Sequence, residues 1–79
     1  MTYLDRDGTQ AWLQSRLDAT QMKTLNRLAE VSGINKGTLS RYFNQTQRPT
    51  IDVVAVLCQS LKVTPSELLY GLGALPSPD

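Results

Sequence analysis

The sequence contains no histidine, and Cys58 is its only cysteine. One cysteine forms neither an internal disulfide nor a zinc site by itself, and such sparse use fits a reducing compartment. Histidine is the most frequent acid–base catalyst, and only seven scattered carboxylates remain to replace it. We therefore expect no metal site, no cofactor and no enzymatic activity, and we interpret Cys58 as a small core residue.

Long apolar runs are also missing from the 79 residues. A membrane-spanning helix needs roughly 20 consecutive apolar residues, and no stretch approaches that length. Residues 1–7 lack the basic-then-apolar order of a signal peptide. We expect a cytoplasmic protein with no membrane partner. The hydrophobic fraction of 41% is too high for a disordered tail and typical of one small folded domain.

Proline is absent from the first 48 residues, and no segment alternates apolar and polar residues in the way of a half-buried strand. The apolar residues recur instead with the period of helices. The pattern predicts an all-α domain with five helices. Their expected ranges are about 9–18, 25–31, 36–43, 51–61 and 65–71.

Capping residues mark several of these helix ends. Thr24 and Asn35 stand where N-caps belong, because their side-chain oxygens accept from free backbone N–H groups. Residues 64–67 read Thr-Pro-Ser-Glu, which is a capping box with proline at the first helical position. Gly33 ends its helix in the left-handed conformation that glycine adopts at little cost.

Helical spacing also predicts which residues are buried in the core. Val53 and Val56 fall on the flank of the fourth helix, where a partner contact and partial burial are equally open interpretations. The positions expected to face inward are Leu13, Leu17, Leu25, Leu28, Ala29, Ile34, Leu39, Tyr42, Phe43, Ile51, Val54, Leu57, Cys58, Leu61, Leu68 and Leu69, with Trp12 at an edge of the core.

Charge is distributed unevenly along the chain. Residues 23–48 hold five basic side chains and one acidic one, a net charge of +4, whereas the remaining residues carry −3. A basic middle with acidic flanks favours a polyanionic partner that is met by one face. On charge alone, a solvated surface with chance clustering is the alternative.

The two helices around Gly33 predict the function most directly. They are short, joined by a turn of about four residues, and cross at Ala29, where only a small side chain permits close approach. This is a helix-turn-helix layout. The outward residues of the second of these helices suit the base edges of a DNA major groove: Asn35, Lys36, Gly37, Ser40 and Arg41.

Residues 28–42, LAEVSGINKGTLSRY, closely resemble the Cro/CI-type (XRE) helix-turn-helix family of phage and bacterial regulators. The resemblance continues through Arg48-Pro49-Thr50 and through residues 61–69, and covers about residues 9–70. Five helices with the motif in the second and third is the plan that it implies, here as a domain of residues 1–72 followed by a flexible tail or linker stub at 73–79. The sequence departs from the common family pattern at Leu25, Val31, Ser32, Phe43 and Gln45.

The resemblance implies a transcriptional regulator, which we expect to be a repressor, that binds double-stranded DNA as a homodimer in a bacterial or phage-infected cell. Helix 36–43 would lie in the major groove, with Lys36, Ser40 and Arg41 reading bases, Asn35 assisting, and Gly37 allowing close approach. The residues expected to contact phosphates are Lys23, Thr24, Thr38, Asn44, Gln45, Thr46, Gln47 and Arg48.

A dimer or partner surface is expected at Val53, Val56, Tyr70, Leu72 and Leu75, because a short apolar segment after the fifth helix has little core left to join. The alternative function is a protein-interaction module with weak or no DNA binding, such as an antitoxin or the partner of another regulator. The modest net charge of +1 and the apolar flank of the fourth helix favour this alternative.

Overall fold

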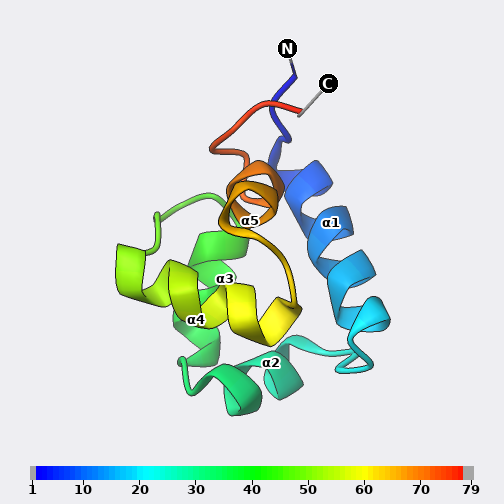
Figure 1. The fold of residues 1–79 in the computed structure, drawn as a ribbon, viewed down its shortest axis with the longest axis vertical. Coiled ribbons are helices and arrows are strands. Elements are labelled where there is room, and N and C mark those ends of the chain that lie inside the picture. Colours follow the sequence, from blue (N-terminus) through cyan, green and yellow to red (C-terminus); the bar gives the residue numbers. More distant parts are fainter. Residues whose placement is uncertain (1, 78–79) are drawn as a thin grey trace.

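The computed structural model describes residues 2–77 and contains only helices and their connections in that range. The helices pack around one core (Figure 1). The predicted all-α fold is confirmed. The elements are α1 (Arg6–Ala19), α2 (Leu25–Ser32), α3 (Lys36–Phe43), α4 (Ile51–Leu61) and α5 (Pro65–Gly71).

The first helix begins three residues earlier than the sequence pattern predicts. Asp5 is its N-cap, and its carboxylate accepts a hydrogen bond from the Gly8 backbone N–H at 2.7 Å. Asp7 adds negative charge in the first turn, where the helix dipole favours it. Gly8 therefore lies inside the first turn and does not delay the helix, which places Thr9 on the buried face.

The predicted caps are confirmed. The Thr24 hydroxyl accepts from the Arg27 N–H at 3.2 Å, and the Asn35 side chain accepts from the Gly37 N–H at 2.8 Å. At the start of α5, residues 64–67 form both hydrogen bonds of the capping box. Gly33 adopts φ 74°, the left-handed conformation expected at the end of α2.

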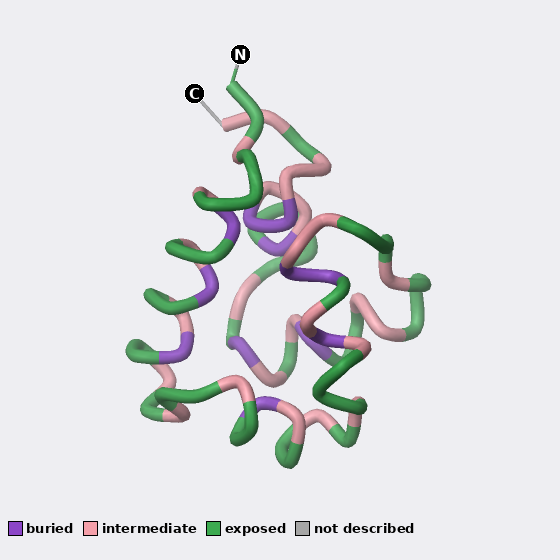
Figure 2. Tube along the Cα trace, turned by 180° about the vertical axis from the view of Figure 1, so that it is seen from behind, coloured by how far each residue is buried: buried purple, intermediate pink, exposed green. Residues whose placement is uncertain are grey.

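All five helices line the core, and their buried segments turn toward the centre of the molecule (Figure 2). Trp12 packs against its edge, as predicted, and lies directly against Gly71. The buried hydrophobic residues are Leu13, Leu17, Leu28, Leu39, Tyr42, Phe43, Leu57, Leu61, Leu68 and Leu72.

Two expectations about apolar residues are wrong. Ile51, predicted to face inward, is 85% exposed, because it is the first residue of α4 and lies about 120° around the helix from the buried Leu57. Leu72, predicted as part of a partner surface, is fully buried. It caps the C-terminus of α5, and its N–H bonds to the Leu68 carbonyl, so the chain remains at the core for one more residue.

The segment after α5 folds back toward the start of the chain. The Ala74 N–H donates to the Leu69 carbonyl at 2.8 Å, and the Ser77 N–H donates to the Thr2 carbonyl at 2.9 Å. The segments that hold Thr2 and Ser77 lie side by side in Figure 1. A pocket of about 650 Å³ lies beside this segment, bordered by Trp12 and Tyr70. The boundary at residue 72 stays a prediction, and residues 78–79 lie outside the described range.

Candidate nucleic-acid interface

The α2–turn–α3 unit is held at its turn and at its core side. The Ser32 hydroxyl accepts a hydrogen bond from the Ile34 N–H at 3.2 Å, which ties the turn on either side of Gly33. Leu28 of α2 and Leu39 of α3 are both fully buried in the same core. The two helices pack against each other as the helix-turn-helix layout requires, so their relative orientation is fixed by the fold.

The two faces of α3 differ sharply. Leu39, Tyr42 and Phe43 are buried and fall within about 100° of arc around the helix axis. Gly37 and Arg41 are exposed and lie on the opposite side. Of the other predicted base-contacting residues, Asn35 and Lys36 are exposed, and Ser40 is half-buried. The fold therefore places Gly37 and Arg41 on the outward side of α3, Asn35 and Lys36 at its exposed N-terminus, and Ser40 at the edge of the buried face.

Arg41 is held by two side chains at this surface. Its Nε donates to Gln47 Oε1 at 3.0 Å, and its Nη2 donates to Thr38 Oγ1 at 3.1 Å. Thr38 belongs to the turn of α3 before Arg41, whereas Gln47 comes from the loop after the helix. Two predicted phosphate-contacting residues thus contact the predicted reading residue instead of standing apart from it.

Gln10 of α1 is a residue that the sequence analysis missed. Its Nε2 donates to the Phe43 carbonyl at 2.7 Å and to Asn44 Oδ1 at 3.1 Å. The Asn44 amide in turn donates to the Ser40 hydroxyl at 3.1 Å. This chain of hydrogen bonds fixes the C-terminal end of α3 against α1. No local pattern marks Gln10, because its partners lie more than thirty residues away.

In the loop between α3 and α4, the side chain of Gln45 makes hydrogen bonds within the domain. Its side-chain nitrogen lies within hydrogen-bonding distance of the Leu4 carbonyl, the Thr9 hydroxyl and the Leu72 carbonyl. An amide nitrogen carries two N–H groups, and three oxygen atoms of the domain already surround this one. Gln45 therefore has no side-chain donor left for the phosphate contact that the sequence predicts. Its φ of 62° lies in the left-handed region that glycine adopts most easily.

Arg48 and Thr46, in the same loop, also make internal contacts. The Arg48 Nη1 donates to the Leu72 carbonyl at 2.7 Å, where its charge meets the C-terminal dipole of α5. The Thr46 hydroxyl donates to the Arg41 carbonyl at 3.1 Å. Both residues remain exposed, so these contacts orient them without removing them from the surface.

The loop before α2 presents Lys23 and Thr24. The Lys23 backbone has φ 71°, and its carbonyl accepts from Gln14 Nε2 at 3.2 Å. The Lys23 side chain is exposed. Because the Thr24 hydroxyl only accepts in its capping bond, its own proton stays available to a phosphate oxygen.

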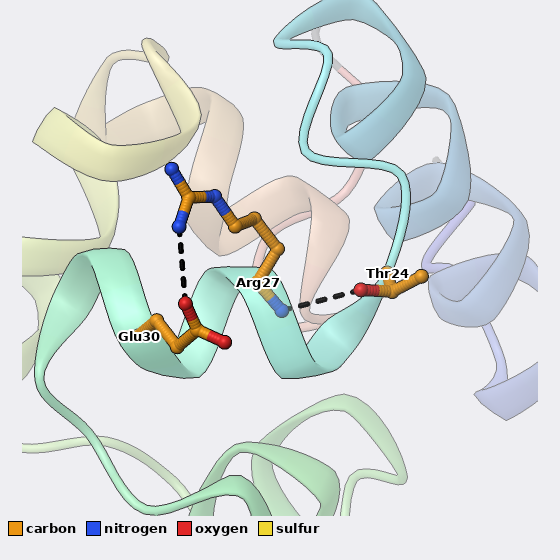
Figure 3. Close-up of polar contacts among 3 residues, drawn as sticks. All are labelled: Thr24, Arg27 and Glu30. Atoms are coloured by element: carbon orange, nitrogen blue, oxygen red, sulfur yellow. Dashed lines mark hydrogen bonds and ion pairs between the residues drawn. The ribbon is translucent and has the colours of Figure 1, made fainter.

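One of the five basic side chains of residues 23–48 is paired with the single acidic one. Arg27 and Glu30 form an ion pair at 3.0 Å on the surface of α2 (Figure 3). Their side chains are 58% and 67% exposed, and a pair of this kind contributes at most about 1 kcal/mol to stability. The net charge of +4 then resides on four other side chains: Lys23, Lys36, Arg41 and Arg48.

Residues 2–77 contain no histidine and one cysteine. They contain no group of three or more His, Cys, Asp or Glu side chains that could hold a metal ion. Cys58 is half-buried against the core, and burial raises the pKa of its thiol, with a further contribution from the Glu67 carboxylate. A raised pKa favours the protonated form of the thiol, which is the less nucleophilic form. No helix in this range is long and apolar enough to cross a membrane.

Comparison with known proteins agrees with this geometry. The family model described as a Cro/C1-type HTH DNA-binding domain matches residues 13–70, which include α2, α3, α4, the second half of α1 and most of α5. The search of curated proteins and the search of solved structures each find no match. Because the matched region spans well over half of the sequence, the chain belongs to the Cro/C1-type helix-turn-helix family of DNA-binding domains.

Proposed function

We propose that the chain is a sequence-specific transcriptional regulator that binds double-stranded DNA as a homodimer and acts as a repressor in a bacterial or phage-infected cell. The observation that carries the proposal is the outward face of α3. It presents Lys36, Gly37 and Arg41 to solvent on a helix whose opposite face is locked into the core. A helix in this position fits the major groove, and its occupation of the groove blocks other proteins.

Base reading falls to the side chains of α3. Arg41 carries a planar guanidinium that suits the O6 and N7 acceptors of guanine. Lys36, at the N-terminal end of the helix, reaches a base edge or a flanking phosphate. Ser40 contributes a hydroxyl and Asn35 an amide, while Gly37 permits close approach of the backbone.

Phosphate contacts set the register of the helix without reading sequence. We assign them to side chains on both sides of α3: Lys23, Thr24, Asn44, Thr46 and Arg48. The two other predicted phosphate contacts, Thr38 and Gln47, hold Arg41 instead. The backbone N–H groups at the starts of α2 and α3 also favour phosphate, because a helix N-terminus carries partial positive charge.

Dimer formation is proposed through α5 and the segment beside it. Tyr70 is half-buried and Leu75 is 39% exposed there, and on α4 Val56 is 36% exposed beside the half-buried Val53. One domain of this size reads about half a turn of groove, whereas two copies on half-sites about 10 bp apart read enough sequence for regulation. A sedimentation experiment should give a dimer on the best operator; a monomer both free and bound would overturn this assignment.

A protein-interaction module is the second candidate, and a specific observation favours it. Ile51 is 85% exposed on α4, close in sequence to the exposed Val56, so this helix presents apolar side chains to solvent. The two residues lie about 140° apart around the helix, and apolar side chains left in solvent suit a protein partner where they join a larger patch. Binding to random duplex DNA at low salt separates the two candidates, because only the DNA-binding function predicts it.

Selection of bound sequences from a random pool of duplex DNA tests the proposed function. A sequence-reading dimer should enrich one motif with two-fold symmetry and half-sites about 10 bp apart. Enrichment of a single unrepeated half-site would retain sequence reading and overturn the dimer. Recovery of no motif, with binding that is equal for all duplexes, would contradict sequence-specific regulation.

A further inference from the structure

Arg41 does not project freely from α3. Its Nε and Nη2 atoms donate to Gln47 and Thr38, at 3.0 and 3.1 Å. The acceptors lie on two different elements, the first half of α3 and the loop that follows it, so the guanidinium is fixed from two directions.

The position of the guanidinium along the helix is also defined. Its Nη1 lies 3.9 Å from the point where a Cβ atom on Gly37 would stand. Arg41 therefore folds back toward the N-terminal half of α3 and lies over Gly37. A longer side chain at residue 37 would occupy the space in which the guanidinium lies.

We propose that Thr38 and Gln47 are positioning residues that hold Arg41 in its base-reading orientation, and that this clamp sets the sequence preference of the domain. Of the five N–H donors of a guanidinium, the clamp engages the one on Nε and one on Nη2. Both Nη1 protons and the second Nη2 proton stay available. They form the end-on fork that meets the O6 and N7 atoms of guanine.

The clamp acts on specificity because it lowers the entropy that Arg41 loses on binding. An arginine that is already ordered loses less rotamer freedom when it meets its base. The benefit arises only where Arg41 finds a guanine, so it raises affinity for the preferred sequence and leaves binding to other sequences unchanged. A role of Thr38 or Gln47 as a phosphate contact alone has the opposite signature, an equal loss on every sequence.

The inference rests on the proposed function, and its test compares the affinities of single variants for the selected duplex and for a scrambled duplex. Gln47→Ala should reduce the ratio of the two affinities by about 3- to 10-fold and leave affinity for scrambled DNA unchanged. The reduction should come from the one base pair per half-site at which Arg41→Ala loses preference. The double variant Gln47→Ala with Arg41→Ala should lose no more than Arg41→Ala alone.

Matched variants separate the hydroxyl and the amide from general effects. Thr38→Val keeps the shape of the side chain and removes its oxygen, so it should behave like Gln47→Ala, whereas Thr38→Ser should retain the preference. Gln59→Ala, at an exposed glutamine on α4, is the control for glutamine removal and should leave both affinities unchanged. An equal loss on both duplexes with Gln47→Ala, or additive losses in the double variant, would overturn the clamp.

A readout on the free protein completes the test. The Arg41 Nε proton, followed by nuclear magnetic resonance, should exchange with solvent several-fold faster in Gln47→Ala than in the unaltered chain. Unchanged exchange would overturn the clamp. If the unaltered chain binds DNA but Gln47→Ala and Thr38→Val do not change its sequence preference, the clamp is overturned and the proposed function stands. Absence of DNA binding by the unaltered chain removes the proposed function and the clamp together.

Discussion

Gly33 occupies a backbone conformation that most other residues adopt only at a cost. Its φ is 74°, and the space around its Cβ position is open, so a substitution there meets strain in the backbone and not a clash. Gly33→Val should destabilise the fold by more than about 1 kcal/mol, because β-branching opposes positive φ. Urea denaturation measures the change. Gly33→Asn should cost less, and equal stability of the Val and Asn variants would contradict the account.

Gly71 is required for a different reason. A Cβ atom on this residue would overlap the ring of Trp12, the only tryptophan in the sequence. Gly71→Ala should destabilise the fold by about 1–3 kcal/mol, as overpacking of a core generally does. Denaturation followed by Trp12 fluorescence measures it.

A second variant tests whether overlap with the ring is the cause. Adding Trp12→Phe to Gly71→Ala provides room for the new methyl group, so the two changes together should cost less than the sum of their separate effects. Strict additivity would show that Gly71 is needed for something other than contact with the indole.

The start of α5 depends on its capping box. The Thr64 hydroxyl accepts from the Glu67 N–H at 3.2 Å, and the Glu67 carboxylate accepts from the Thr64 N–H at 3.3 Å. Thr64→Ala should cost about 0.5–2 kcal/mol of unfolding free energy, and the loss should be global because α5 contributes Leu68 to the core. Glu67→Gln keeps an acceptor and serves as the control. A Thr64→Ala variant as stable as the control would contradict the importance of the box.

Helix ends with caps were the most predictable part of the fold. Thr24, Asn35 and Thr64 indicate the starts of their helices, because their short side chains accept hydrogen bonds from backbone N–H groups two or three residues later. The sequence pattern predicts the start of α1 too late, because glycine has a low helix propensity and Gly8 stands in the first turn of a helix that Asp5 caps. Ile51 was misplaced because α4 is apolar nearly all round, and its sequence alone does not say which apolar face meets the core.

The candidate site was predictable in its residues and not in its contacts. The helical wheel of α3 identifies Gly37 and Arg41 as outward, because Leu39 and its neighbours fix the inward side, and Lys36 is exposed as the first residue of the helix. The sequence does not show that Gln10 supports the end of α3, or that Gln45 turns inward. Those contacts join residues distant in the chain, and they exist only once α1 and the α3–α4 loop are packed together.

Charge on the whole molecule should make DNA binding sensitive to salt. If the protein neutralises about four phosphates per subunit, the plot of log K against log salt should have a slope of about −3.6 for each subunit. Titration between low and physiological ionic strength measures it. A flat dependence would contradict DNA binding through this surface.

Arg48→Ala refines that prediction. Because Arg48 is assigned to a phosphate, its removal should weaken binding to all sequences alike and reduce the slope by about 1. The contact of Arg48 with the Leu72 carbonyl also supports the end of α5, so the variant's stability must be measured alongside. Loss of preference at a single base pair would instead make Arg48 a reading residue.

The central claim is that α3 reads DNA sequence and that Arg41 is its main reading residue, with Lys36 second. The two residues lie about 140° apart around the helix and about 7.5 Å apart along it, so they cannot share one base. The most direct measurement is the affinity of Arg41→Ala for the preferred duplex and for a scrambled duplex. The account predicts a loss of about 1–3 kcal/mol on the preferred duplex, relaxed preference at one base pair per half-site, and little change on scrambled DNA. An equal loss on both duplexes would show that Arg41 is a phosphate contact and would contradict the claim.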